Sequence, residues 1–132
     1  MPVERKTKLL VVDDEPEVAD GLALYGKRMG YQTFVAYDGP SAVAKAEAER
    51  PDIILLDISL PGMDGRDVMR ELKASGVADT AIVVFVTARD SQTDRIVGLE
   101  LGAADYEAKP LHFGMLFKKI ERLLEKKSLG EL

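Results

Sequence analysis

Short apolar runs alternate with amphipathic stretches along nearly the whole chain. Leu9 to Val12 is continuously apolar and ends directly in acidic residues. Such a run is typical of a strand that is buried on both faces of a sheet. Similar runs follow the first three amphipathic stretches, whereas the segment after the fourth, Asp105 to Lys109, is short and mostly polar. The pattern predicts strands at residues 9–12, 33–37, 53–56, 81–86 and 105–109.

The stretches between these runs carry apolar residues at helical spacing. Val18, Leu22, Tyr25 and Met29 recur every three to four residues after the first run, which predicts an amphipathic helix. Glycine and proline punctuate the chain where helices are expected to begin or end. These signals stand at Gly30, Gly39-Pro40, Pro51, Gly76 and Gly102, with a capping pair expected at Ser91 and Asp94. The last helix presents Phe113, Leu116, Phe117, Ile120, Leu123 and Leu124 on one face.

Five strand–helix units joined by short loops predict an α/β fold with a parallel sheet that helices cover on both faces. Right-handed crossovers favour the strand order 2-1-3-4-5, which is that of the flavodoxin-like doubly wound (βα)5 sandwich. The 132 residues suffice for one core. We expect a single domain over residues 8–127, with tails at residues 1–7 and 128–132.

The composition narrows the class of protein. With 46% hydrophobic and 31% charged residues, the chain is expected to be globular and soluble. It has no cysteine, no apolar run of membrane-spanning length and no secretory signal in its charged first eight residues. These features predict a cytoplasmic protein without membrane contact. The net charge of −5 argues against direct nucleic-acid binding. The basic residues near the C-terminus are expected to form a solvated helix face, and they are Lys118, Lys119, Arg122, Lys126 and Lys127.

Acidic side chains follow two strands that the expected topology makes neighbours. Asp13 and Asp14 come directly after the first strand, and Asp57 comes directly after the third. Ligands of such sheets bind outside the carboxyl ends of the strands, near the switch in strand order. Two acids after a strand also suit the start of a helix, but three converging carboxylates repel one another unless a cation neutralises them or their pKa values separate. Oxygen ligands of this kind fit Mg²⁺ better than zinc or copper.

Two further polar residues end strands at the same edge. Thr87 follows the fourth strand and Lys109 the fifth. An ammonium and a hydroxyl near a carboxylate cluster can stabilise a transferring phosphoryl group. Individually, Lys109 also fits an ordinary surface ion pair and Thr87 a strand-end hydroxyl bond. The coincidence of all five residues at one sheet edge favours a phosphoryl-transfer site.

Four segments carry a resemblance to a known family. They are VVDDE from Val11, LLDISLPGMDG from Leu55, VTA from Val86 and GAADYEAKP from Gly102. In this order they resemble the receiver domains of two-component response regulators. The resemblance extends from about Lys8 to Lys127, which is nearly the whole chain.

The resemblance implies a role for each site residue. Asp57 would be the phosphoacceptor. Asp14 would bind Mg²⁺ directly and Asp13 through water, with Asp57 and the backbone carbonyl of Ser59 completing the protein ligands. Lys109 and Thr87 would contact the phosphoryl group. Thr87 and Tyr106 would form a switch pair in which the ring turns inward, and the Lys109-Pro110 peptide bond would be cis.

The resemblance also implies partners. A histidine kinase or phosphotransfer protein would donate the phosphoryl group, and an output domain or protein would read the surface of the fourth helix, fifth strand and fifth helix. The chain would be a signalling domain rather than an enzyme, catalysing only its own phosphorylation and dephosphorylation. Arg89 would border the site and affect the lifetime of the phosphate.

This chain departs from the common pattern of the family at that surface. Ala104 stands where many relatives have an acid, and Leu111 replaces the usual phenylalanine. Arg95, Asp105 and Lys119 could supply charged pairs to a dimer, but Met115 falls where another acid would extend the network. We therefore expect a weak, phosphorylation-dependent homodimer or a different partner.

Other readings of the same pattern predict different chemistry. A haloacid-dehalogenase-like phosphatase also uses a strand-end aspartate, magnesium, a threonine and a lysine, but it needs a second aspartate where this chain has Ser59. A flavodoxin-like flavin binder needs a loop of backbone donors after the first strand, where Asp13, Asp14 and Glu15 would repel the flavin phosphate. A receiver that only scaffolds is disfavoured because the site residues are all present.

Overall fold

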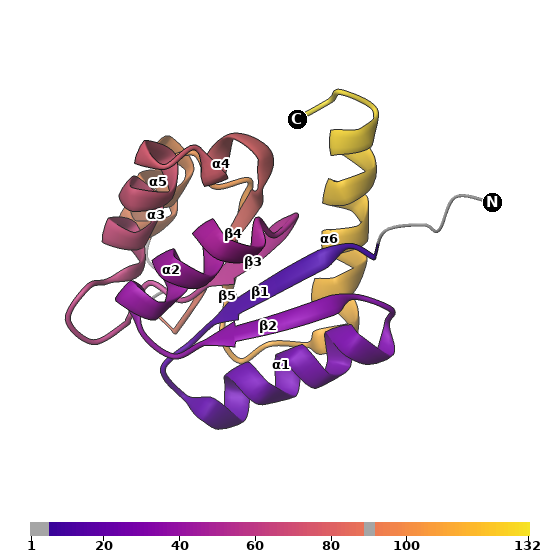
Figure 1. The fold of residues 1–132 in the computed structure, drawn as a ribbon, viewed down its shortest axis with the longest axis horizontal. Coiled ribbons are helices and arrows are strands. Elements are labelled where there is room, and N and C mark those ends of the chain that lie inside the picture. The colour runs from indigo at the N-terminus through magenta and orange to yellow at the C-terminus, as the bar shows by residue number, and fades with distance from the viewer. Residues whose placement is uncertain (1–5, 89–91) are drawn as a thin grey trace.

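Figure 1 shows the computed structural model of the chain, which describes residues 6–88 and 92–132, with only the backbone at residues 92–94. Strands and helices alternate as the sequence pattern predicts. The strands are β1 (Lys8–Val12), β2 (Gln32–Ala36), β3 (Ile53–Leu56), β4 (Ile82–Thr87) and β5 (Asp105–Ala108). The helices are α1 (Pro16–Arg28), α2 (Gly39–Glu49), α3 (Gly65–Ala74), α4 (Val77–Thr80), α5 (Gln92–Glu100) and α6 (Phe113–Ser128).

All five strands pair in parallel in the order β2-β1-β3-β4-β5, so the predicted fold is confirmed. Successive side chains of a strand point to opposite faces of a sheet. Leu9 and Val11 therefore join a core layer with α1 and α6, whereas Leu10 and Val12 join a layer with α2 and α3. Two buried layers explain why the strands are apolar throughout rather than alternating in polarity.

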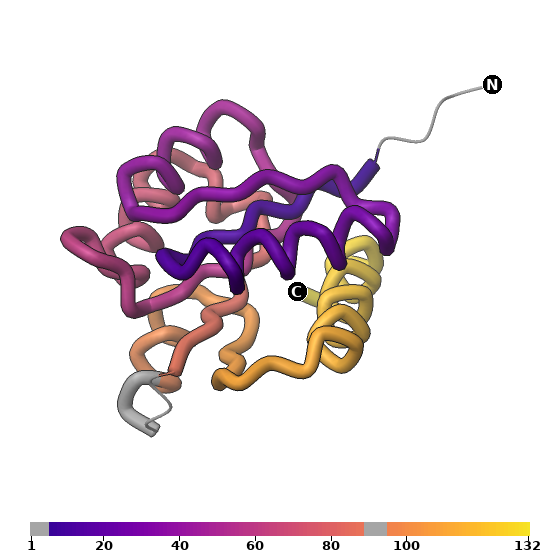
Figure 2. Tube along the Cα trace, turned by 90° about the horizontal axis from the view of Figure 1, so that it is seen from below, coloured from indigo at the N-terminus to yellow at the C-terminus, as the bar shows by residue number. Residues whose placement is uncertain are grey.

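Helices α1 and α6 lie side by side on one face of the sheet (Figure 2). Their contact is aromatic, since the Tyr25 ring meets Phe113 edge-on at 5.7 Å and Phe117 at 4.9 Å between centroids. This packing holds the end of the β5–α6 loop against α1. It thereby fixes where the chain that follows β5 lies relative to the start of α1.

The structure corrects several predicted boundaries. Strand β2 begins at Gln32, which pairs with Lys8, and β4 runs to Thr87, which pairs with Ala108. Helix α6 reaches Ser128, one residue past the predicted domain boundary. The short helix α4 was not predicted. Gly76, with a φ of +84°, separates α4 from α3, and four residues are too few for a helical apolar period to show.

Polar side chains cap several helices. Asp38 and Asp64 accept hydrogen bonds from the first backbone N–H groups of α2 and α3. His112 caps α6 through Nδ1, which accepts from the Met115 N–H at 3.2 Å.

The predicted cap at Ser91 and Asp94 and the position of Arg89 lie outside the described residues. Among the helices that the structure describes, none has the length and hydrophobicity to span a membrane.

Candidate active site

Three carboxylates meet at the carboxyl ends of β1 and β3. Val12 and Leu56 are register partners, so the residues that follow them are neighbours. The Asp57 N–H donates to the carbonyl of Val12 at 3.0 Å, which fixes the two strand ends together. One carboxylate oxygen each of Asp13, Asp14 and Asp57 lies within 4.8 Å of the others. Asp13 and Asp57 are 2% and 3% exposed, whereas Asp14 is open to solvent.

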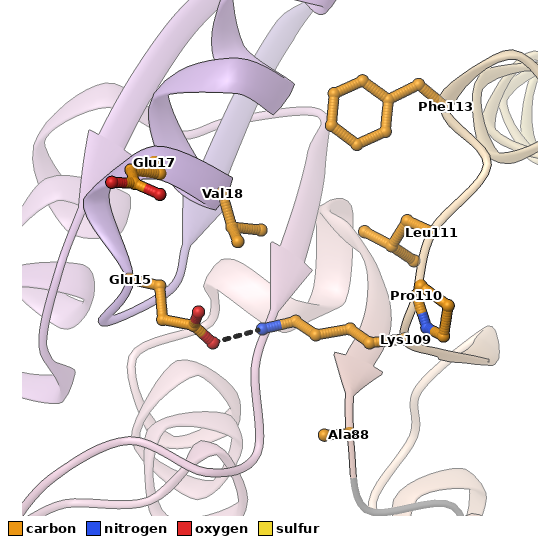
Figure 3. Close-up of a pocket in the computed structure, with 8 residues that line it drawn as sticks. All are labelled: Glu15, Glu17, Val18, Ala88, Lys109, Pro110, Leu111 and Phe113. Atoms are coloured by element: carbon orange, nitrogen blue, oxygen red, sulfur yellow. Dashed lines mark hydrogen bonds and ion pairs between the residues drawn. The ribbon is translucent and has the colours of Figure 1, made fainter.

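Lys109 places its ammonium between these acids from the end of β5. Its Nζ lies 2.7 Å from Asp13 Oδ2 and 3.1 Å from Asp57 Oδ2, and a third contact reaches Glu15 Oε1 at 3.4 Å. Figure 3 shows the side chain extending toward Glu15. The ordinary surface ion pair that the sequence left open is therefore excluded, because the lysine side chain is only 14% exposed and contacts two buried acids. The Lys109–Pro110 peptide bond is cis in the structure.

The two buried acids use their oxygens in the same way. In each, Oδ1 accepts a backbone N–H two residues on, from Glu15 to Asp13 at 2.9 Å and from Ser59 to Asp57 at 2.9 Å. In each, Oδ2 faces the Lys109 ammonium. The loops after β1 and β3 therefore fix the rotation of both carboxylates. One lysine faces them from a third strand.

The charge balance shifts two pKa values upward. Burial raises the pKa of Asp13 and the Asp57 charge adds to this, while hydrogen bonds from Lys109 and the Glu15 N–H oppose it. Burial by itself would lower the pKa of Lys109, but its hydrogen bonds to Asp13 and Asp57 outweigh burial and hold that pKa well above its usual range. The ammonium is thus charged at neutral pH, and the repulsion between the Asp13 and Asp57 carboxylates is one cause of the raised pKa of Asp13.

Thr87 and Ser59 line the side of the site toward β4. Thr87 is fully buried at the end of β4, and its Oγ1 lies 3.4 Å from Ser59 Oγ. Tyr106, on the neighbouring strand β5, is 3% exposed with its ring turned inward, and the Arg95 guanidinium lies 5.1 Å from the ring centroid. The ring thus already lies in the inward position that the resemblance implies for a switch residue.

The donor set fits a magnesium ion. Asp13, Asp14 and Asp57 offer only oxygen ligands, and the exposed side of Asp14 leaves room for the waters that Mg²⁺ retains. Within the described residues, this is the one cluster of acidic, histidine or cysteine side chains with metal-binding spacing. The three acids could therefore hold the ion that the sequence predicts.

A cleft that the sequence did not reveal opens beside Lys109. It has a volume of about 580 Å³ and lies between the start of α1 and the β5–α6 loop (Figure 3). Val18 projects into it from α1, opposite Leu111 and Phe113. Its rim is acidic at Glu15 and Glu17. No sequence signal could have found this cleft, because its walls come from segments about 95 residues apart that tertiary packing brings together.

A comparison with protein families finds one match over most of the chain. Residues 9–121 match the response regulator receiver domain. The chain belongs to this family. As a receiver, it is a domain of two-component signal transduction, so the resemblance seen in the sequence is confirmed.

Proteins with similar sequences agree with this assignment. The receiver is 45% identical over 120 residues to the sensory transduction protein RegX3 of Mycolicibacterium smegmatis, and 43% identical to that of Mycobacterium tuberculosis. Each alignment includes 91% of this chain but only 51–52% of the relative's sequence. The chain therefore spans about half the length of these relatives.

Solved structures share the fold over nearly their whole length. A CheY-like receiver from Methanospirillum hungatei superposes with a TM-score of 0.88 at 26% identity, covering 96% of this chain and 99% of that one. The receiver of Francisella response regulator 1452 gives a TM-score of 0.84 at 28% identity, covering 92% and 99%.

Proposed function

We propose that this receiver accepts a phosphoryl group on Asp57 from a histidine kinase or phosphotransfer protein in a magnesium-dependent reaction. The observation that carries the proposal is the position of the Asp57 carboxylate. It lies within 4.8 Å of two further acids and 3.1 Å from the Lys109 ammonium. A structural ion pair needs one lysine and one acid, whereas here three acids cluster and the one lysine contacts two of them, Asp13 and Asp57. That excess of negative charge is what a metal site requires.

The reaction would transfer a phosphoryl group between two nucleophiles. An Asp57 carboxylate oxygen attacks phosphorus, the bond from phosphorus to the donor breaks, and the donor leaves with the electron pair of that bond. The product is an acyl phosphate on Asp57. Magnesium, held by Asp13, Asp14, Asp57 and the Ser59 carbonyl, would neutralise charge on the phosphoryl oxygens.

The remaining site residues would act on the same oxygens. Lys109 already faces the Asp57 oxygen at 3.1 Å, so a small movement brings its ammonium to an acyl phosphate there. The Thr87 hydroxyl lies next to Ser59 and can turn to donate to a phosphoryl oxygen. Neither group needs to travel from outside the site. This is preorganised electrostatic stabilisation of the transferred group.

Incubation with acetyl phosphate and Mg²⁺ is expected to add one phosphoryl mass per chain, measured on the intact protein. Asp57→Asn should abolish the addition, because an amide is not a nucleophile toward phosphorus. Asp67→Asn is a suitable control, since Asp67 is exposed on α3, away from the acidic cluster, and forms an ion pair with Arg70. Equal labelling of Asp57→Asn and the parent would exclude Asp57 as the acceptor.

Output would proceed through the surface of α5, β5 and α6, which corresponds to the fourth helix, fifth strand and fifth helix of the sequence prediction. Phosphorylation adds about −1.5 to −2 charges, which draws in the Thr87 hydroxyl and favours the inward ring of Tyr106. The phosphate biases this equilibrium only through its different contacts in the two states. Because the RegX3 relatives are about twice as long as this chain, we propose an output domain or protein as the reader of that surface.

Dimerisation through that surface is expected to be weak. The Lys119 ammonium already pairs within the chain with Asp105 at 3.2 Å and with Glu107. A dimer that used these charges would exchange one set of ion pairs for another, and exposed pairs contribute only about 0–1 kcal/mol each. Met115 is 68% exposed and adds no charge.

Sedimentation with and without beryllofluoride, a phosphoryl mimic, tests both the surface and the switch. We expect a monomer without the mimic, partial dimerisation at high concentration with it, and an altered NMR environment for the Tyr106 ring. Asp57→Asn should show neither change. A tight dimer in both conditions, or a Tyr106 signal that ignores the mimic, would contradict the proposal.

A further inference from the structure

The loop from Asp57 to Gly65 carries both the phosphoacceptor and Ser59, and it closes back on its own beginning. The Gly65 N–H donates to the carbonyl of Ile58 at 2.9 Å, so the first residue of α3 lies against the residue that follows Asp57. The Ser59 N–H in turn donates to Asp57 Oδ1. The conformation of this loop therefore sets the orientation of the Asp57 carboxylate.

Gly65 has no space for a side chain. A Cβ atom there would lie 2.5 Å from the carbonyl oxygen of Asp57 and 2.7 Å from the Cα of Ile58. Contacts below 3.0 Å essentially do not occur for real Cβ atoms. Both obstacles are backbone atoms, so no side-chain rotation could relieve the contact. Any other residue at position 65 would force α3 and the Asp57 backbone apart.

A second glycine fixes the far side of the same loop. Gly39 begins α2, and a Cβ there would lie 2.7 Å from Met63 Cβ and 2.8 Å from the Met63 carbonyl oxygen. The starts of α2 and α3 therefore hold the loop between them. Both glycines are buried.

Crowded glycines elsewhere meet only side chains. A Cβ at Gly26 would lie 2.8 Å from Leu9 Cδ2 and 3.2 Å from Thr33 Cγ2, and one at Gly98 would meet the Phe85 ring at 2.8 Å. Those positions are explained by packing in the core, far from the acids in the case of Gly26. The backbone contact at Gly65 is different in kind because it acts on the phosphoacceptor residue itself.

We propose that Gly65 and Gly39 are positioning residues for the phosphoryl-transfer site. By allowing the starts of α3 and α2 to approach the loop, they hold the Asp57 carboxylate and Ser59 where metal and phosphoryl donor can bind together. This inference rests on the function proposed above. Neither glycine touches a reacting atom.

Gly65→Ala is the direct test, with Gly26→Ala as a control at a glycine that side chains crowd in the core, distant from the site. In Gly65→Ala, the contact with the Asp57 carbonyl must open from 2.5 Å to at least 3.0 Å. A misplacement of this order in a site can reduce its rate by about 10- to 100-fold. We expect the affinity for Mg²⁺, measured by calorimetry, and the maximal rate of labelling by acetyl phosphate both to fall at least about 10-fold. Gly26→Ala should lower the melting temperature but leave both quantities within about 2-fold of the parent.

Gly39→Ala provides an independent variant. Its effect should have the same direction as that of Gly65→Ala but be smaller. Part of the obstacle at Gly39 is the Met63 side chain, which can move, whereas all the obstacles at Gly65 are backbone atoms. The proposal is overturned if Gly65→Ala and Gly26→Ala lose similar stability while Mg²⁺ affinity and labelling rate stay unchanged in both. It is also overturned if Gly65→Ala fails to fold where Gly26→Ala folds, since Gly65 would then serve the fold. If the parent accepts no phosphoryl group, the proposed function fails, but the Mg²⁺ affinities still test the role of Gly65.

Discussion

Lys109→Ala is expected to lower the unfolding free energy of the metal-free protein at neutral pH by about 3 kcal/mol, because it leaves two buried carboxylates without their cation. Asp13 and Asp57 both direct Oδ2 at the Lys109 ammonium, and both are almost fully buried. The same change should reduce the rate of labelling by acetyl phosphate at least about 100-fold, since the ammonium no longer stabilises the transferred group. Chemical denaturation and intact-mass kinetics measure the two effects.

The loss of stability in Lys109→Ala should depend on pH in a defined direction. Burial already raises the pKa of Asp13, and removing the ammonium that opposes this raises it further. A carboxyl group whose pKa is higher in the folded state favours folding at low pH, and this advantage disappears as the pH rises through the folded pKa. The deficit relative to the parent should therefore be smallest in acid and grow toward neutral pH. In the parent, the raised pKa of Lys109 means that its contribution is complete below the usual lysine value of 10.5.

Two comparisons identify the origin of the deficit in Lys109→Ala. Lys118→Ala removes an exposed lysine from α6 and should change stability by no more than about 0.5 kcal/mol. Added Mg²⁺ should narrow the gap between Lys109→Ala and the parent, because the ion supplies the missing positive charge. A variant as stable as the parent in metal-free buffer at neutral pH would mean that Lys109 does not compensate the buried acids.

Asp14→Ala is expected to abolish the stabilisation of the protein by Mg²⁺ and to reduce labelling by acetyl phosphate at least about 100-fold. Asp14 is the exposed member of the acidic cluster, so it would be the first of the proposed ligands that an incoming ion and its waters meet. In metal-free buffer the same variant should be as stable as the parent, or more stable by up to about 0.5 kcal/mol, because one of three repelling charges is removed. Thermal melts over a range of Mg²⁺ concentrations measure both parts.

Glu17→Ala is the matched control for Asp14→Ala. Glu17 is an exposed acid in the first turn of α1, and it does not belong to the cluster of Asp13, Asp14 and Asp57. It should leave the Mg²⁺-dependent rise in melting temperature intact. If metal-free Asp14→Ala melted far below the parent, Asp14 would be a structural residue, and the magnesium assignment would lose its main support.

The sequence by itself determined the fold and the list of candidate site residues. Buried parallel strands must be apolar on both faces, so runs such as Ile53 to Leu56 are recognisable without any structure. Short connections between them then leave few topologies. Because the carboxyl ends of parallel strands share one sheet edge, the acids after β1 and β3 could be placed together from their positions in the chain.

The sequence could not determine how the charged side chains pair, and there the tertiary structure decided. Lys109 could have formed a surface ion pair, and Lys119 could have supplied a charged pair to a dimer. The structure instead places Lys109 between Asp13 and Asp57, and Lys119 against Asp105 and Glu107. A long lysine side chain can reach several acids with little difference in energy. Its partner therefore depends on where the packing of the helices and strands places the ammonium group.

The close backbone approach at Gly65 was also beyond the sequence. A glycine in the GMDG segment suits a turn or a helix start equally well, and local pattern does not distinguish them. Only the packing of α3 against the end of β3 shows that a Cβ would meet the carbonyl of Asp57. The strands could be predicted because their pattern of apolar residues depends only on neighbours in the chain. The contact at Gly65 depends instead on the angle at which a whole helix meets the sheet.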